Sequence, residues 1–342
     1  MRNLLSACLV LFFGAAQAPA QQIEANILTG GSAGTYIQIG RDISAVAQSQ
    51  GVNLIVNESN GSMENIYGVY NRPQTQLGIV QNDVLDFIRN IRKDNAELNR
   101  LADSVRLVMP LYNEEIHLVA NPELQSLADL ANARVSIGPE NSGTQLTATL
   151  LLDALAIKPK AVAFMTPQDS LEAFLKGEVD AFFYVGGAPL KLLTDERLAP
   201  ENARLLPLDD ERLMSYYVGS SIPAGTYNFL TSDYSGVAVK SVLMTYEFAG
   251  SQTKYYKDSC DIVAKVTASV WENIDDLQVN GHPKWKSVNL DDIPPGWEKS
   301  ECVLTGEKLA KGDANVYSDP ADCDAITNPI TRNLCVVQTT QQ

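Results

Sequence analysis

The sequence predicts an α/β fold of two lobes that are joined by two extended segments. Short apolar runs alternate with longer segments of helical period in two successive blocks, over residues 23–80 and 134–185. Strands and helices that alternate in this way pair their strands in parallel, which is typical of α/β proteins. With 342 residues, of which 45% are hydrophobic, the chain can bury one large or two medium-sized cores.

The first block has three short apolar runs, each bounded by polar or glycine-rich turns. Between the first two runs, Ile39, Ile43, Val46 and Ala47 recur at helical spacing, which predicts an amphipathic helix. In chain order the predicted elements are strand 23–28, helix 36–48, strand 52–56, helix 63–70 and strand 76–80.

The second block repeats the order of the first. Its last strand, residues 181–185, is a continuous apolar run, as expected of a parallel strand that is buried on both faces. In chain order the predicted elements are strand 134–137, helix 145–154, strand 161–164, helix 170–175 and strand 181–185.

Two extended stretches are expected to cross between the lobes, at residues 117–120 between the blocks and at residues 216–219 after the second block. On this division lobe I is discontinuous and comprises residues 21–118 and 220–303, and lobe II comprises residues 119–219. Residues 304–342 are polar, with little periodicity, and are predicted to form an irregular C-terminal extension held by cysteines.

Residues 1–20 have the pattern of a secretory signal peptide, with a basic head, an apolar run over residues 4–13 and small residues before a cleavage site near Ala20. The apolar run is too short for a membrane span, so the mature protein is expected to be soluble in the periplasm. An alternative is lipid attachment at Cys8, in Leu5-Ser6-Ala7-Cys8. The apolar run would then follow the cysteine instead of preceding it, which argues against this alternative.

The net charge of −15 argues against nucleic acid and anionic membranes as partners. Cys260, Cys302, Cys323 and Cys335 allow three disulfide pairings in an oxidising compartment, and local loop closure favours Cys260 with Cys302 and Cys323 with Cys335. No C-x-x-C pair occurs and the chain has only two histidines, so neither a metal site nor a cofactor is predicted.

The glycine-rich turn Gly30-Gly31-Ser32-Ala33-Gly34 lies between a predicted strand and a predicted helix. Glycines let a backbone approach a ligand, and a helix start presents unpaired N–H groups, so the turn is a candidate anion site. The competing interpretation is a structural turn in which Ser32 or Thr35 caps the helix.

Similar turns follow other predicted strands. Ser142-Gly143-Thr144 opens the first helix of lobe II. This turn and the glycine-rich turn, facing each other across a cleft, could together bind a carboxylate. Asn60, Ser62 and Gln81 follow two further strands of lobe I, at the strand ends where open α/β sheets bind ligands. Turn and cap chemistry is the alternative for Asn60 and Ser62.

An enzyme must also be considered, because Gly30 to Gly34 matches the G-x-S-x-G nucleophile elbow of serine hydrolases. An elbow normally follows several strands, whereas only one strand precedes Ser32. The one histidine late enough in the chain, His282, lies in an ordinary turn before a proline. His117 is expected to be a structural histidine. The sequence therefore favours a binding protein over an enzyme.

In the turns described above, and in several further motifs given below, the sequence resembles the TAXI proteins, the TRAP-associated extracytoplasmic immunogenic solute receptors. The resemblance covers residues 23–300 and implies a type II periplasmic-binding-protein fold. It implies that a receptor captures glutamate, 2-oxoglutarate or a similar carboxylate and delivers it to a TRAP membrane permease. The protein is expected to be a monomer. A receptor that informs a membrane sensor is the alternative. The matching motifs, in order, are 29–36, 60–65, 80–83, 127–130 with 134–138, 141–144 and 222–227.

The resemblance also implies which residues line the ligand site. Ala33 and Ile37 depart from the family pattern, which often has a further glycine and a second tyrosine there, so this corner is expected to be more apolar. Arg41 is the only arginine considered as an anion clamp. The expected ligand-binding residues are Gly31, Ser32, Tyr36, Asn60, Ser62, Gln81, Ser142, Gly143 and Thr144.

Overall fold

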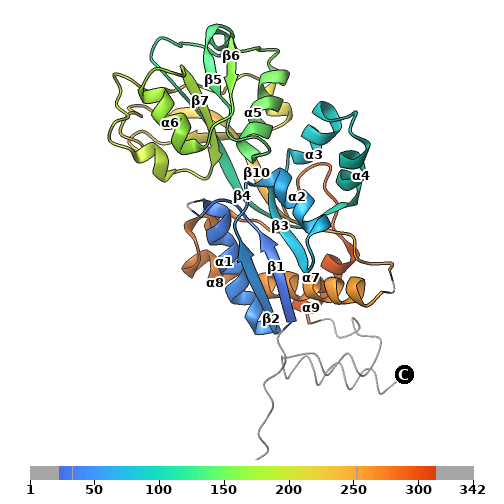
Figure 1. The fold of residues 1–342 in the computed structure, drawn as a ribbon. Coiled ribbons are helices and arrows are strands. Elements are labelled where there is room, and N and C mark those ends of the chain that lie inside the picture. The colour runs from blue at the N-terminus through green and yellow to red at the C-terminus, as the bar shows by residue number, and fades with distance from the viewer. Residues whose placement is uncertain (1–22, 33, 252, 313–342) are drawn as a thin grey trace, which may run out of the picture.

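The computed structural model describes residues 23–32, 34–251 and 253–312. Two lobes are stacked one on the other, and the long strands β4 (Val105–Ala120) and β10 (Tyr234–Tyr246) run from one lobe into the other (Figure 1). The predicted two-lobed α/β fold is confirmed. The predicted signal peptide lies outside the described residues, and no helix within them is long and apolar enough to cross a bilayer.

Lobe I is built on one half of a mixed sheet, in the order β2-β1-β3-β10-β4. The strand β1 pairs in parallel with both β2 and β3, as predicted, whereas β10 is antiparallel to β3 and β4. The parallel pairs place the carboxyl ends of β1, β2 and β3 at one edge of the sheet. The new strands are β1 (Ile23–Leu28), β2 (Val52–Asn57) and β3 (Thr75–Gln81).

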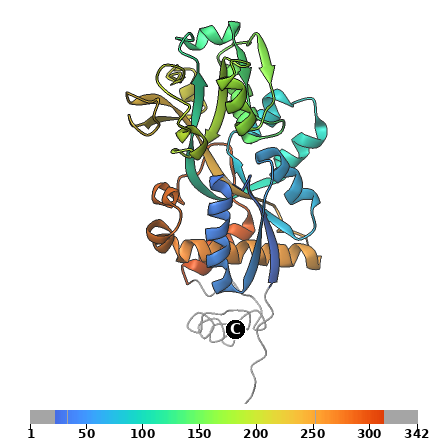
Figure 2. The ribbon, with the colours of Figure 1, turned by 60° about the vertical axis from the view of Figure 1, so that its left-hand side comes forward.

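Helices cover both faces of the lobe I sheet, and α7 runs across its base (Figure 2). On α1 the buried residues Ile39 and Ile43 lie four positions apart and join the core, as the helical period predicts. The helices are α1 (Thr35–Ala47), α2 (Ser62–Asn71), α3 (Val84–Asp86), α4 (Ala96–Ser104), α7 (Lys254–Glu272), α8 (Ile274–Asn280) and α9 (Glu301–Ala310), with short helices η1 (Gln48–Gln50), η2 (Phe87–Ile91) and η6 (Pro283–Ser287).

Lobe II continues the same sheet through β4-β7-β5-β6, with parallel β5–β6 and β5–β7 pairs. The buried aromatics Phe182 and Phe183 of β7 point to opposite faces and enter two different core clusters, which explains why this strand is apolar on both sides. The elements are β5 (Arg134–Ser136), β6 (Ala161–Ala163), β7 (Ala181–Gly186), β8 (Arg204–Leu205), β9 (Val218–Ile222), α5 (Gly143–Ala154), α6 (Pro167–Leu175), η3 (Leu127–Asn132), η4 (Lys191–Thr194) and η5 (Leu213–Ser215).

The second crossing between the lobes is β10, not residues 216–219 as the sequence suggested. Val237 and Val239 pack in a lobe II core, and Val242 packs in the lobe I core, so the chain returns to lobe I near residue 240. Tyr217 is instead buried in lobe II. Lobe II therefore extends some twenty residues beyond the predicted boundary at 219, because β9 turns back and pairs with β10.

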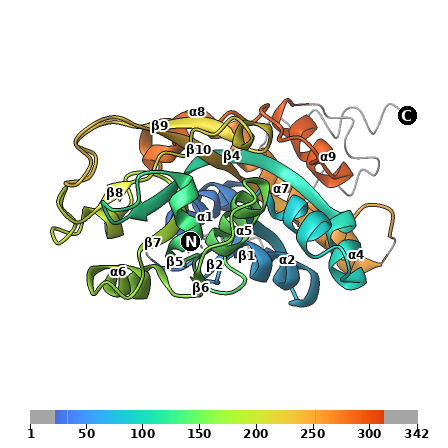
Figure 3. The ribbon, with the colours of Figure 1, turned by 90° about the horizontal axis from the view of Figure 1, so that it is seen from above.

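The lobes touch each other along α5. Leu146 of this helix is fully buried and belongs to the lobe I core, and Leu150 packs against the same core. Seen from above, α5 lies over the lobe I elements (Figure 3). The structure is therefore a closed arrangement, in which the first helix of lobe II is seated on lobe I.

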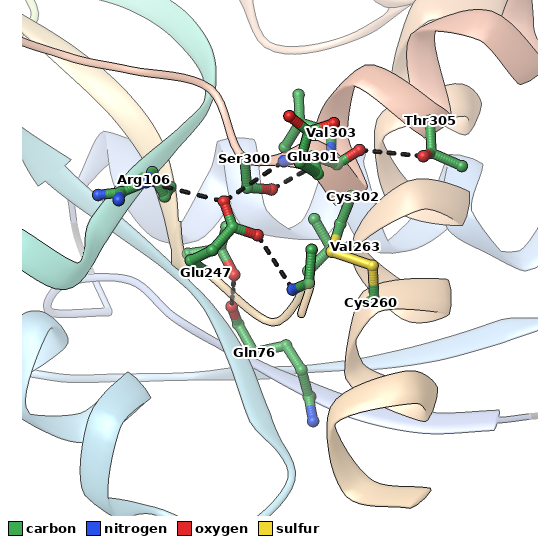
Figure 4. Close-up of a disulfide and its surroundings, with 12 residues drawn as sticks. Gln76, Arg106, Glu247, Cys260, Val263, Ser300, Glu301, Cys302, Val303 and Thr305 are labelled. Atoms are coloured by element: carbon green, nitrogen blue, oxygen red, sulfur yellow. Dashed lines mark hydrogen bonds and ion pairs between the residues drawn. A yellow bond between two sulfur atoms is a disulfide. The ribbon is translucent and has the colours of Figure 1, made fainter. Parts of the chain in front are cut away.

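The predicted disulfide between Cys260 and Cys302 is confirmed, and it joins α7 to α9 (Figure 4). Residues 304–310, predicted to be irregular, form the second part of α9. Ser300 caps this helix through a hydrogen bond from the Val303 N–H, and Gly306 packs directly against the backbone of α7. Cys323 and Cys335 lie outside the described residues.

Candidate functional site

The centre of the candidate site is Glu114, on β4 at the point where this strand crosses between the lobes. The side chain is only 4% exposed and accepts hydrogen bonds from three neutral groups. Gln81 Nε2 and Tyr36 Oη donate to one carboxylate oxygen at 3.0 and 3.3 Å, and Tyr112 Oη donates to the other at 3.0 Å. Glu114 is therefore hydrogen-bonded to side chains from β3, α1 and β4.

Gln81, the last residue of β3, connects Glu114 to lobe II. While its Nε2 donates to Glu114, its Oε1 lies against the start of α5, where a Cβ atom at Gly143 would be 2.2 Å away. Only a glycine at position 143 allows this approach. The buried Ser62 hydroxyl accepts a hydrogen bond from the Gln81 N–H at 3.1 Å and so fixes the end of β3.

A second buried carboxylate, Asp83, receives hydrogen bonds from lobe II. Thr147 Oγ1 donates to Asp83 Oδ2 at 2.8 Å, and Tyr217 Oη donates to the same oxygen at 3.3 Å. Thr147 is fully buried on α5, on the helix face that meets lobe I. These hydrogen bonds extend the polar contact between the lobes beyond Gln81.

The helix starts of α2 and α5 face each other beside this cluster. Gly61, which precedes α2, has φ of +107°, a conformation that favours glycine, and a Cβ atom there would lie 3.5 Å from the Gly143 nitrogen. The first N–H groups of a helix have no acceptor within the helix and carry partial positive charge. Two such helix starts therefore meet at the interface of the lobes.

Burial governs the protonation of these groups. It raises the pKa of Glu114 to about 7, although the hydrogen bonds from Gln81, Tyr112 and Tyr36 oppose the shift. Burial likewise raises the pKa of Asp83 to about 7, against the hydrogen bonds from Thr147 and Tyr217. Both carboxyls thus change charge near neutral pH.

The residues predicted from the sequence divide into two groups. Tyr36, Ser62, Gln81 and Gly143 are brought together around Glu114. Ser142 and Thr144 flank Gly143 and are buried, with hydroxyls that accept hydrogen bonds from the Gln145 and Val185 N–H groups. They hold the start of α5 in place.

The remaining predicted residues lie outside this cluster. Gly31 and Ser32 are exposed. Asn60 is also exposed and turns back to Glu64, whose carboxylate accepts hydrogen bonds from its amide nitrogen and its backbone N–H. Arg41, considered as an anion clamp, is exposed on α1 and donates to Gln38.

The histidines have structural partners. His282 Nδ1 accepts a hydrogen bond from the Lys284 N–H at 3.2 Å, and no hydrogen bond within the described ranges joins it to Ser32. His117 is buried beside Tyr227 Oη, at 2.8 Å, and beside the Glu115 and Tyr184 carbonyls, which confirms the structural role expected of it.

Sequence reasoning missed Glu114, Tyr112 and Thr147, and it included Asp83 only as part of the polar motif at residues 80–83 and not among the expected ligand-binding residues. A signal for Glu114 was present, because Asn113-Glu114-Glu115 interrupts a long apolar stretch between residues 105 and 120. Thr147 carried no such signal, since a threonine inside an apolar helix is common and only the packing of the lobes brings it to Asp83.

Two surface hollows lie elsewhere, away from Glu114. One, of about 530 Å³, is on lobe II and is lined in part by Leu127, Leu155 and Arg212. The other, of about 700 Å³, is at the base of lobe I beside Tyr255 and Ile262. The described part of the chain has no group of three or more His, Cys, Asp or Glu side chains that could hold a metal ion.

Comparison with solved structures finds distant similarity. A protein of Bordetella bronchiseptica RB50 matches at 10% identity and a TM-score of 0.48, over 84% of this chain and 89% of that chain. The ligand-binding core of GluR0 from Nostoc punctiforme, in complex with L-glutamate, matches at 12% identity and a TM-score of 0.42. The match covers 78% of this chain and 96% of that chain. The protein Tv2483, bound to L-arginine, matches at 14% identity and a TM-score of 0.46. The match covers 78% of this chain and 92% of that chain.

The sequence itself gives the assignment to a family. The model of the NMT1-like family matches residues 27–296, which span both lobes and both crossing strands. The two lobes within this match share one sheet, and its lobe I half has the strand order β2-β1-β3-β10-β4. The chain belongs to the NMT1-like family, a family of periplasmic binding proteins.

Proposed function

We propose that this protein is a periplasmic receptor that captures a small carboxylate-bearing solute between its lobes and delivers it to a TRAP-type membrane permease. The observation that carries the proposal is the meeting of Gln81 with Gly143, where the start of a lobe II helix lies against the polar end of a lobe I strand. Groups from both lobes can contact one solute there, so binding stabilises the closed form.

The solute carboxylate is assigned to the start of α5. This helix has twelve residues, and its first N–H groups together with the helix dipole favour an anion. Thr144 Oγ1, which accepts a hydrogen bond from Val185 N–H, keeps its own proton for donation. We place the carboxylate near Gly143 and Thr144, with Tyr36, Ser62 and Gln81 opposite, and include Gly31, Ser32, Asn60 and Ser142 as the rim.

We further propose that the protein acts as a monomeric binding protein and not as an enzyme. The exposure of Ser32, together with the capping role of His282, supports this view over a serine hydrolase. Delivery to a TRAP permease rests on the resemblance of the ordered motifs to TAXI receptors. Solute uptake driven by an ion gradient into vesicles that contain the permease, stimulated by the added receptor, is the expected behaviour.

Calorimetric titration tests the binding proposal. The protein is unfolded and refolded to remove any bound solute, and it is then titrated with dicarboxylates, 2-oxo acids and the common L-amino acids. At least one solute is expected to bind with micromolar affinity or better, about −8 kcal/mol. Absence of heat across the whole panel would sink the proposed function.

A further inference from the structure

Glu114 is a buried carboxylate without a cationic partner. Its neighbour in sequence, Glu115, pairs with Lys284 at 3.0 Å, but no ion pair among the described residues includes Glu114. Its hydrogen-bond donors are an amide and two phenols, which carry no charge. Buried charges in proteins are usually paired, since a lone one is costly to desolvate.

Asp83 adds to the negative potential of the same region. It is 2% exposed, takes part in none of the ion pairs of the described residues, and its Oδ1 has no hydrogen-bond partner there. Tyr36 Oη donates to Glu114 at 3.3 Å, and the pKa of this hydroxyl is raised by burial first and then by the charges of Glu114 and Asp83. A positively charged group at this point would interact favourably with both.

The positively charged side of the site, at the start of α5, lies only one amide group away from Glu114. The Gln81 amide has its nitrogen on Glu114 and its oxygen against Gly143, at the positive start of α5. A negative and a positive region are therefore separated by about the width of one carboxamide. An α-amino acid carries its ammonium and carboxylate groups on one carbon atom, and so has charges of matching sign and spacing.

We propose that Glu114 binds the ammonium group of the solute, so that the receptor selects amino acids over the 2-oxo acids with the same carbon skeleton. This inference rests on the proposed function, since it assigns the solute of the same site. A 2-oxo acid has a carbonyl oxygen in place of the ammonium group, and this oxygen would face the ionised Glu114 carboxylate with like partial charge. A site built to receive an N–H donor discriminates strongly against an analogue without one.

The experiment compares each amino acid that binds with its own 2-oxo acid, for example L-glutamate with 2-oxoglutarate and L-leucine with 4-methyl-2-oxopentanoate. On the wild-type protein, the oxo acid is expected to bind at least about a hundredfold more weakly. Glu114→Gln keeps a polar side chain of the same shape, and it is expected to weaken amino-acid binding by a similar factor while leaving oxo-acid binding within about threefold. Glu196→Gln, at an exposed site on lobe II, is the matched control and should change neither affinity.

The outcomes are distinguishable. Equal affinity of an amino acid and its oxo acid for the wild-type protein overturns the inference and leaves the proposed function intact, and this comparison needs no variant. Unchanged amino-acid affinity in Glu114→Gln overturns it equally. If no solute of either class binds, the proposed function fails and the inference fails with it. A purely structural role for Glu114 predicts a lower melting temperature in Glu114→Gln, whereas a binding role predicts an equal or higher one.

Discussion

Thr147 of lobe II donates a hydrogen bond to Asp83 of lobe I at 2.8 Å, and both side chains are buried. The bond joins the first helix of one lobe to the end of a strand in the other. With Tyr217, which donates to the same oxygen, it makes the closed arrangement of the lobes partly polar. Direct polar contacts of this kind fix the register in which two lobes meet.

Thr147→Val is expected to destabilise the closed protein by about 1–3 kcal/mol, because it leaves the buried Asp83 carboxylate with one donor fewer. Urea unfolding measures the loss. Thr149→Val is the matched control, since the Thr149 hydroxyl donates to the Gln145 carbonyl and accepts from the Gln145 side-chain amide, both within the same helix. Equal losses in the two variants would show that the contact between the lobes contributes nothing.

Gly143→Ala is expected to weaken solute binding at least about tenfold without unfolding the protein. Its Cβ atom would lie 2.2 Å from Gln81 Oε1, at the flexible end of a side chain, so Gln81 would move away from Glu114 while the backbone stays in place. Calorimetry with the solute that binds the wild-type protein measures the effect. Gly219→Ala, also on lobe II, would contact nothing within 4 Å and should bind as the wild type does.

Asp83 and Glu114 should each contribute less to the stability of the solute-free protein as pH rises from about 4 towards 7, whereas the buried His117, whose pKa burial lowers to about 4, contributes in the opposite direction. Burial raises the pKa of Asp83 from 3.8 and that of Glu114 from 4.5, each to about 7. In this window the folded protein holds protons that the unfolded chain has lost, so unfolding becomes easier as pH rises. The stabilisation from these bound protons is present in full below the pKa values that Asp83 and Glu114 have in the unfolded chain, and it is lost above about pH 7.

Asp83→Asn isolates this effect, because an amide does not titrate. Thermal melting of the variant is expected to depend less steeply on pH than that of the wild type between pH 4 and 7, and a slope equal to that of the wild type would contradict the assignment. The titratable groups that interact electrostatically with Asp83 are Asp86, Tyr36 and Tyr217, and those that interact with Glu114 are Tyr36, Tyr112, Glu115 and Tyr184.

Removal of the disulfide by Cys260→Ala with Cys302→Ala should destabilise lobe I by roughly 4 kcal/mol, since the bridge closes a segment of 42 residues. Chemical denaturation of the oxidised wild type and of the double variant gives the difference. Solute affinity is expected to stay the same, because α7 and α9 lie at the base of lobe I, on the side away from lobe II (Figure 1). A large loss of affinity would contradict this separation of stability from binding.

The sequence predicted the elements of the first block and of the second to within a few residues, because hydrophobic period and turn residues act locally. The strand at residues 23–28 and the helix that begins near residue 36 are examples. The second crossing was misplaced, since the apolar run of β10 continues without a break from the lobe II core into the lobe I core. Nothing local marks the residue at which a strand changes lobes.

The candidate site was predicted in part for the same reason. Gln81 and Gly143 stand out in the sequence because each follows or opens a regular element. Glu114 lies in the middle of a strand, and its role depends on three side chains brought together by the fold. Ser32, the most conspicuous residue of the glycine-rich turn, is exposed and is not part of the cluster.

A crystal structure of the protein with the amino acid that binds most tightly tests the central claim most directly. The account predicts the solute between the lobes, with its ammonium group within hydrogen-bond distance of Glu114 and its carboxylate at the Gly143 end of α5. A solute seated instead in the lobe II hollow beside Leu127 and Leu155, or in the lobe I hollow beside Tyr255, would contradict it.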